Sequence, residues 1–227
     1  MSHKVNITRI KAVSNALGAL KDKVVFVGGA TVSLYADRMA EEARPTDDVD
    51  ILVEIWSRKD FAQLEEQLRK RGFTNDTESK FIGRYLLPGI IVDVMPTDEN
   101  ILGFSNRWYA GGLKTSVDYA IEAIHSVRIF SPPYFIASKL EAFKNRGSDD
   151  GRTSSDFEDI VFVLENRRSI WEEVNTADEK VRKYLKDEFK NLLINPYIEE
   201  WVDSHVSFNS PSSTYYILAQ MEKFVKG

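Results

Sequence analysis

Cysteine is absent from this chain of 227 residues, and histidine occurs only three times. Without cysteine the chain can form no disulfide, thiolate zinc site, iron–sulfur cluster or cysteine nucleophile. The histidines His3, His125 and His205 are scattered and lack the short spacing of a histidine metal site. If the protein uses a metal, carboxylates are therefore expected to hold it, which directs attention to paired acidic residues.

Long apolar runs and an excess of basic residues are also missing. The chain has 30 Lys+Arg against 35 Asp+Glu, a formal net charge of −5. We do not expect it to coat nucleic acid non-specifically, because that needs a net basic face, although a local basic cleft is compatible with this total. No segment approaches the ~20 apolar residues of a membrane span, and the N-terminus lacks the apolar core of a signal peptide. These absences favour a cytoplasmic protein with no membrane partner.

The hydrophobic pattern changes near residue 131. Before it, strand and helix patterns are mixed, and Gly18 weakens an N-terminal helix without ending it. Strand patterns occupy residues 24–27, 48–55, 80–87, 90–95 and 126–130. After Ser131-Pro132-Pro133 the patterns are helical, at residues 134–146, 155–166, 178–193 and 213–225. The sequence therefore predicts an α/β (α+β) fold, with a small mixed-sheet module at residues 1–130 and a helical module at residues 131–227.

Two aspartates, Asp48 and Asp50, begin the second strand pattern. At i and i+2 of a strand both side chains leave the same face, roughly 7 Å apart along the backbone. Such neighbours repel each other unless a cation lies between them, and Mg²⁺ prefers carboxylate oxygens together with substrate phosphates. The alternative is a solvated acidic turn at the start of a strand. Asp93, flanked by valines in the strand at residues 90–95, is the candidate for a third acid if two metals are held.

A Gly28-Gly29 pair ends the first strand pattern and precedes a helix pattern over residues 30–40. Backbone N–H groups at such a turn attract anions, and the missing Cβ atoms let a phosphate approach closely. Alone, the pair is equally typical of an ordinary tight turn. Combined with the Asp48/Asp50 strand that follows, it predicts a phosphate cradle beside a dicarboxylate.

These residues carry a family resemblance. The order Gly28-Gly29, then Arg44-x-Thr46-x-Asp48-Val-Asp50, then Asp93, resembles the polymerase-β-type nucleotidyltransferase superfamily. Within it the chain most resembles the AbiEii/MenT-like group, which includes bacterial toxins of toxin–antitoxin pairs. The second half adds Lys139-Leu-Glu-Ala-Phe143, Arg146 and Asp156-Phe-Glu-Asp159, but Ser155 stands where a lysine is common. The resemblance spans roughly residues 26–164 and implies a nucleotidyltransferase module followed by a helical module that completes the nucleotide cleft.

The resemblance also implies a reaction and a metal. A nucleoside monophosphate moves from a nucleoside triphosphate (NTP) to a hydroxyl acceptor, with Mg²⁺ or Mn²⁺ as cofactor. Asp48 and Asp50 would bind both metals. Asp93 would bind the catalytic metal and help deprotonate the acceptor, while Gly28, Gly29 and Lys139 would hold the phosphates.

Four further candidate site residues each have two possible interpretations. Arg44 and Thr46 either contact phosphate or only shape their loop. Arg146 lies two helical turns after Lys139 and therefore on the same side of the helix, where it either binds phosphate or belongs to a solvated face. Asp159 positions either Lys139 or the base. Ser155 with Glu158 resembles a helix-capping box.

The sequence leaves several acceptors possible. The resemblance favours tRNA or another RNA 3′ end, with an antitoxin protein as a partner. A local basic rim for RNA would be formed by Arg38, Arg44, Lys139, Lys144, Arg146 and Arg152. A small molecule such as an aminoglycoside, or a protein hydroxyl, is the alternative acceptor. The rival from another class is a catalytically silent nucleotidyltransferase fold that binds a protein partner. Loss of one of the three aspartates would have favoured this rival, and all three are present.

Overall fold

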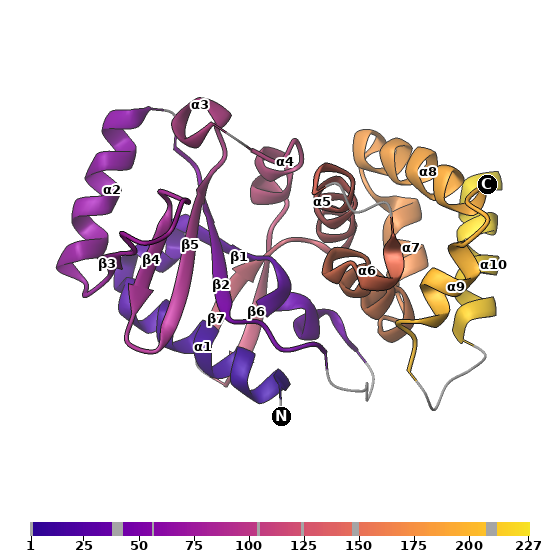
Figure 1. Ribbon diagram of the computed structural model, residues 1–227, viewed down its shortest axis with the longest axis horizontal. Helices are drawn as coiled ribbons and strands as arrows, with labels where there is room; N and C mark the ends of the chain where they lie inside the picture. Colours follow the sequence, from indigo (N-terminus) through magenta and orange to yellow (C-terminus); the bar gives the residue numbers. More distant parts are fainter. Residues whose placement is uncertain are drawn as a thin grey trace. The chain divides into compact units, whose positions relative to one another are not determined.

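The computed structural model describes residues 2–37, 43–55, 57–103, 105–123, 125–146, 150–207 and 213–227. The chain divides into two compact units (Figure 1). Unit 1 comprises Met1–Leu34 and Arg44–Ser131, and unit 2 comprises Tyr35–Ala43 and Pro132–Gly227. Within the described ranges, no helix combines the length and the apolar character that crossing a membrane requires.

Unit 1 is built on a mixed sheet of seven strands in the described residues, in the order β3-β4-β5-β2-β1-β7-β6. The strands are β1 Val24–Val27, β2 Asp48–Val53, β3 Thr74–Asn75, β4 Arg84–Leu87, β5 Ile90–Pro96, β6 Val117–Glu122 and β7 His125–Ile129. The pairs β2–β5 and β1–β7 are parallel, and the other neighbours are antiparallel. All four residues of the central β1 are buried, as expected for a short apolar strand with neighbours on both sides.

The helices of this unit precede, follow or connect the strands. They are α1 Ser2–Leu17, the 3₁₀ helices η1 Gly18–Lys23 and η2 Gly29–Tyr35, α2 Arg58–Lys70, α3 Glu99–Leu102 and α4 Tyr109–Lys114. Helix α1 buries Ile10, Val13 and Leu17 and contacts β2. Gly18 has a φ of 53°, so it ends this α-helix rather than only weakening it.

Unit 2 is helical, as the sequence predicts. Its helices are α5 Pro132–Asn145, η3 Gly151–Thr153, α6 Ser155–Asn166, α7 Ile170–Thr176, α8 Glu179–Leu193, α9 Ile198–Asp203 and α10 Ser213–Lys226. Helix α5 packs against α6, α7 and α8, and α10 packs against α8. Aromatic side chains fill the interior, including a cluster of Phe143, Phe157 and Trp201 with ring centroids 5.5–6.0 Å apart. The predicted combination of a mixed α/β part and a helical part is thus confirmed.

The prediction of a helix over residues 30–40 is corrected by the structure. A short 3₁₀ helix, Gly29–Tyr35, takes its place, and residues 38–40 lie outside the described ranges. The backbone N–H and the hydroxyl of Thr31 both donate to the carbonyl of Gly28, at 3.3 and 2.9 Å, which tightens the first turn. The Tyr35 ring then packs against the Phe135 ring, with centroids 4.3 Å apart. The Asp37 N–H donates to the carbonyl of Asn166, and residues from Tyr35 onward belong to unit 2.

Candidate functional site

Strand register places an acidic cluster on one face of the sheet in unit 1. Asp50 of β2 pairs with Asp93 of β5, and Arg84 of β4 pairs with the same Asp93 from the other side. Side chains directly opposite each other on neighbouring strands lie close together on the same face. Asp48, two residues before Asp50, shares that face because side chains alternate along a strand.

The three aspartates Asp48, Asp50 and Asp93 form what we call the carboxylate triad. One carboxylate oxygen from each lies within 4.8 Å of the other two. Asp93 is buried, while Asp48 and Asp50 are partly exposed, so the triad is accessible from one side. Three hard oxygen donors at this spacing are a donor set that suits Mg²⁺ or Mn²⁺. The structure therefore brings together the three acids that the sequence singled out.

Arg84 is a member of this site that the sequence analysis missed. Its Nε and Nη2 donate to the two carboxylate oxygens of Asp93, both at 2.7 Å, and Nη2 lies 3.8 Å from Asp48 Oδ2. The hydrogen bonding that Arg84 donates to Asp93 raises the pKa of Arg84 above its ordinary value, against the opposing effect of burial. The signal was present in the turn at Pro88-Gly89. Leu87 pairs with Ile90 across this turn, and the same register puts Arg84 opposite Asp93.

The Gly28-Gly29 turn lies directly beside the triad. Val27 pairs with Asp50, and a Cβ on Gly28, whose φ is 72°, would overlap the Asp50 carboxylate. A Cβ on Gly29 would overlap the Arg44 guanidinium and come within 2.8 Å of the Thr46 methyl group. The space that these glycines leave is thus occupied by side chains of the protein itself. Their predicted contact with phosphate stays a prediction.

Thr46 holds the loop that leads into β2. Its buried hydroxyl donates to the carbonyl of Asp48 at 3.2 Å, and its carbonyl accepts a hydrogen bond from the Arg9 guanidinium. These contacts support the loop-shaping interpretation of Thr46. A phosphate contact by Thr46 or Arg44 stays a prediction.

In unit 2 the predicted residues Lys139 and Asp159 form a cluster with Asp156 between α5 and α6. Lys139 Nζ lies 3.0 Å from Asp156 Oδ1 and 2.7 Å from Asp159 Oδ2, and we call these three side chains the buried ion network. The Lys139 side chain is 8% exposed and that of Asp159 is 1% exposed. Burial would lower the pKa of Lys139, but the charges of Asp159 and Asp156 outweigh it and leave this pKa raised. Asp159 therefore has the geometry of a residue that positions Lys139.

Arg146 reaches the same network from its edge. Its Nη1 lies 3.2 Å from Asp156 Oδ2, while its own side chain is 68% exposed. Lys139 on α5 and Arg146, which directly follows this helix, thus contact the same carboxylate. Asp156 was not among the predicted site residues, although it contacts both cations. The expected cap at Ser155 is wrong by one residue, because Ser154 accepts the hydrogen bond from the Phe157 N–H.

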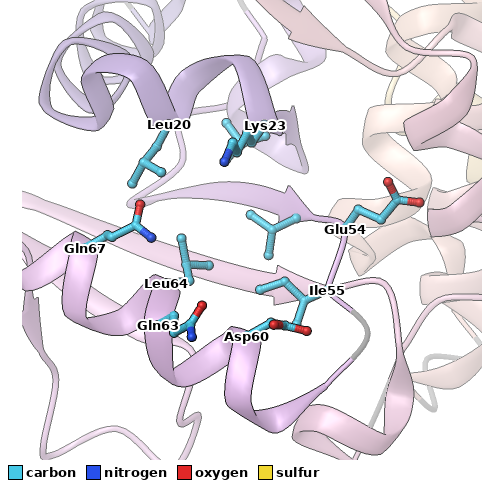
Figure 2. A pocket seen from close by; sticks show the side chains of 10 residues that line it. Leu20, Lys23, Glu54, Ile55, Asp60, Gln63, Leu64 and Gln67 are labelled. Atoms are coloured by element: carbon cyan, nitrogen blue, oxygen red, sulfur yellow. The ribbon is translucent and has the colours of Figure 1, made fainter.

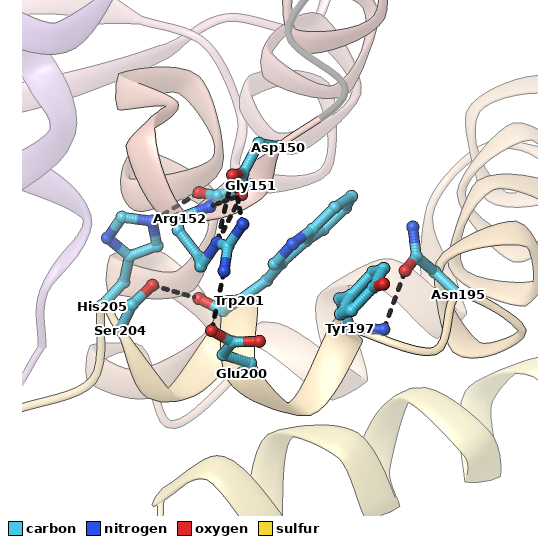
Figure 3. A network of polar contacts seen from close by, with 9 residues as sticks. All are labelled: Asp150, Gly151, Arg152, Asn195, Tyr197, Glu200, Trp201, Ser204 and His205. Atoms are coloured by element: carbon cyan, nitrogen blue, oxygen red, sulfur yellow. Dashed lines mark hydrogen bonds and ion pairs between the residues drawn. The ribbon is translucent and has the colours of Figure 1, made fainter.

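Several members of the proposed basic rim have acidic partners within unit 2. Lys144 pairs with Glu188 at 2.6 Å, and Arg152 pairs with both Asp150 and Glu200, at 2.6 and 2.8 Å (Figure 3). Figure 3 also shows the imidazole of His205, whose Nε2 lies 2.7 Å from the carbonyl of Gly151. The pair of Arg152 and Glu200 connects η3 to α9. Arg38 lies outside the described residues.

A pocket of unit 1 lies away from all predicted site residues. It has a cavity volume of about 170 Å³ and is lined by residues of η1, α2 and the segment that follows β2, including Lys23, Glu54 and Gln63 (Figure 2). Val24 and Val53, which also line it, pair at one end of β1 and β2, whereas Val27 and Asp50 pair at the other end. The pocket and the triad thus lie at opposite ends of these strands.

Comparisons with known proteins found a likeness to solved structures but no matching family model or curated protein. The structure is similar to the solution structure of the antibiotic-resistance factor ANT(2'')-Ia, with a TM-score of 0.49 and 15% sequence identity. The alignment covers 85% of this chain and 96% of that chain.

Proposed function

We propose that the protein is a nucleotidyltransferase that depends on a divalent metal and transfers a nucleoside monophosphate from an NTP to a hydroxyl acceptor. The observation that carries this proposal is the carboxylate triad, with one oxygen each from Asp48, Asp50 and Asp93 within 4.8 Å of the others. Like charges at this spacing repel strongly in a partly buried place, so a function that uses a cation explains why they converge. The Gly28-Gly29 turn lies beside the triad, and the sequence predicts a phosphate contact there.

The proposed reaction forms and breaks one bond at the α-phosphorus. The acceptor oxygen bonds to this phosphorus, the bond to the oxygen that bridges to the β-phosphorus breaks, and pyrophosphate leaves. The hydroxyl proton of the acceptor passes to Asp93. Asp48, Asp50 and Asp93 would hold Mg²⁺ or Mn²⁺, which when bound offsets the charge of the phosphates. Phosphate contacts by Gly28, Gly29, Arg44, Thr46, Lys139 and Arg146 belong to the same proposal.

The narrower proposal concerns the acceptor and the setting. It rests on the sequence resemblance to the AbiEii/MenT-like group, which favours tRNA or another RNA 3′ end, a toxin role and an antitoxin partner. The ion pairs of Lys144 and Arg152 with acidic neighbours reduce the basic rim that RNA would use. A small molecule or a protein hydroxyl is therefore tested beside RNA. That unit 2 completes the nucleotide cleft also stays a prediction.

A second candidate function is a catalytically silent fold that binds a protein partner. Arg84 favours it, because a guanidinium bound to both oxygens of Asp93 supplies the positive charge that a metal would otherwise supply. A domain with such an internal cation can be stable without any metal. The two candidates differ in one measurable property, the transfer of label from an NTP.

The deciding experiment is a transfer assay with matched variants. The protein is incubated with Mg²⁺ and each NTP labelled at the α-phosphorus, and total tRNA, a protein mixture or an aminoglycoside is supplied as acceptor. We expect Asp48→Ala and Asp93→Ala to reduce transfer by about a hundredfold or more, as loss of one charge-stabilising group does in other enzymes. Asp118→Ala removes an exposed strand aspartate of β6 and should leave transfer unchanged.

One control and two outcomes decide how the assay is interpreted. Label at the γ-phosphorus should not be transferred, because it leaves with pyrophosphate. Undiminished transfer by both Asp48→Ala and Asp93→Ala would refute the metal-dependent mechanism. No transfer to any acceptor by the wild type would favour the silent binding module.

A further inference from the structure

Arg84 is held at the triad by its strand as well as by its charge. Gly83 comes directly before it, and the Gly83 carbonyl accepts a hydrogen bond from the Val94 N–H at 2.8 Å. A Cβ on Gly83 would overlap the carbonyl of Val94, so only glycine allows β4 to approach β5 this closely at that point. The backbone therefore places Arg84 directly opposite Asp93.

The position of the guanidinium matters for a metal. Asp93 engages Arg84 through both of its oxygens, and Asp48 Oδ2 lies 3.8 Å from Arg84 Nη2. Arg84 thus bridges two of the three residues that would hold a cation. Both oxygens of Asp93 already accept a hydrogen bond from Arg84. A metal at the triad would therefore lie close to the guanidinium, and the two positive charges would repel each other.

We propose that Arg84 is an internal counter-cation that occupies the triad in the metal-free protein and leaves it when a divalent metal binds. This inference rests on the metal site of the proposed function. Arg84 stabilises the metal-free fold by neutralising convergent carboxylates. It also lowers the apparent affinity for a metal, because molecules in which Arg84 holds Asp93 are not competent to bind one. The apparent affinity of any site falls by the fraction of molecules that are competent to bind.

The test compares Mn²⁺ binding by the wild type, Arg84→Gln and Arg167→Gln, using isothermal titration calorimetry. Arg167 is the matched control, because its Nε and Nη2 bind the two oxygens of Glu173, both at 2.6 Å, in unit 2. Binding that disappears in Asp93→Asn defines the triad site. We expect Arg84→Gln to bind Mn²⁺ about tenfold more tightly than the wild type, which is the change that about 1.4 kcal/mol produces. Arg167→Gln should bind with wild-type affinity.

Thermal unfolding supplies a readout that is independent of catalysis. In EDTA, both arginine variants should unfold at a lower temperature than the wild type, since each loses a bidentate pair. Saturating Mn²⁺ should reduce this deficit for Arg84→Gln and leave it unchanged for Arg167→Gln. Equal Mn²⁺ affinity of Arg84→Gln and wild type, or an Arg84→Gln deficit that Mn²⁺ does not change, would overturn the inference.

A measurement on the wild type covers the case in which Arg84→Gln does not fold. The Nε–H signal of Arg84 in an NMR spectrum, assigned with Arg84→Lys, should shift and exchange faster with water when Mg²⁺ is added. A signal that does not change while Mg²⁺ binds would overturn the inference.

The transfer assay on the same preparations separates this inference from the proposed function. Transfer that depends on the triad, with unchanged Mn²⁺ affinity in Arg84→Gln, overturns only the role of Arg84. Tighter Mn²⁺ binding by Arg84→Gln without any transfer by the wild type supports the role of Arg84 and counts against the proposed nucleotidyltransferase activity. Absence of triad-dependent Mn²⁺ binding in every variant overturns both.

Discussion

The two units each contain aspartates beside cationic side chains, and the two clusters differ in how open they are. In the carboxylate triad of unit 1, three acids converge on a partly exposed face where the Arg84 guanidinium reaches Asp93 and Asp48. In the buried ion network of unit 2, Asp156 and Asp159 enclose the Lys139 ammonium, and all three side chains are at most 8% exposed.

This difference predicts that the triad can exchange its cation for a ligand, whereas the charges of the network are balanced within the fold. Charges that are buried must be paired and hydrogen-bonded within the fold, and the network of unit 2 meets this condition without any ligand. Carboxylates that converge on an accessible face can instead exchange an internal cation for an external one. We therefore expect accessibility and replaceable pairing to identify a ligand site better than the presence of acids does.

The largest effect is expected for Lys139→Met. This variant leaves Asp156 and Asp159 buried without their ammonium partner, and removal of one partner from a buried ion pair typically costs about 3–5 kcal/mol of unfolding free energy. Urea unfolding followed by circular dichroism measures the loss. Lys144→Met is the control on the same helix, because Lys144 is 47% exposed and its pair with Glu188 should contribute less than about 1 kcal/mol.

Equal losses in the two variants would show that the network of unit 2 is not structural. A stable Lys139→Met protein that no longer binds NTP would instead support the phosphate contact proposed for Lys139. In either case the network would not be purely structural.

The second effect is a loss of stability at alkaline pH. The pKa of Lys139 is raised in the folded protein, so the folded chain keeps a proton that the unfolded chain releases above its ordinary pKa near 10.4. The contribution of Lys139 is thus fully present below that pH and decreases as the pH rises toward the folded-state pKa, by about 1.4 kcal/mol per pH unit. The stability gap between wild type and Lys139→Met, measured by urea unfolding at pH 9, 10 and 11, should therefore narrow.

Tyr85 and Tyr134 titrate in the same direction in both proteins. Burial, together with hydrogen bonds to Glu65 and Asp178 respectively, raises the pKa of each phenol. Their effect cancels in the difference between wild type and Lys139→Met. A gap that is constant with pH would contradict an ammonium ion at Lys139.

The smallest effect on stability is expected for Arg146→Gln. Its pair with Asp156 involves a guanidinium that is 68% exposed, so we expect a loss below about 1 kcal/mol that becomes smaller in high salt. If Arg146 also contacts phosphate, transfer of label should fall although the protein remains fully folded at the assay temperature. A loss of several kcal/mol would show that the network extends to the surface of unit 2.

Local patterns predicted the elements whose signals are complete within a few residues. The strand at residues 24–27 and the helix at residues 155–166 have the predicted bounds in the structure. The turn at Pro88-Gly89 joins two paired strands as expected. Apolar periodicity, glycine and helix-capping side chains are properties of neighbouring residues, so they can be read without knowledge of the fold.

Other elements depended on distant partners and were missed. Strand β6 is largely exposed and alternates weakly, and its pairing with β7 makes it a strand. The short helices α7 and α9 are held by contacts of Trp171 and Trp201 with aromatic residues of other helices. The helix expected over residues 30–40 was shortened because Tyr35 and Asp37 pack into unit 2. In these cases tertiary packing outweighed the local preference.

The sequence by itself determined that any metal site of this protein would depend mainly on oxygen donors, since it has no cysteine and few histidines and places Asp48, Asp50 and Asp93 in two strand patterns. The tertiary structure decided which charges meet. Strand register brought Arg84 to Asp93, and the packing of α5 on α6 buried Lys139 between two aspartates. The physical reason is that residue identity and period are local, whereas pairing and burial arise only when segments distant in the sequence come into contact.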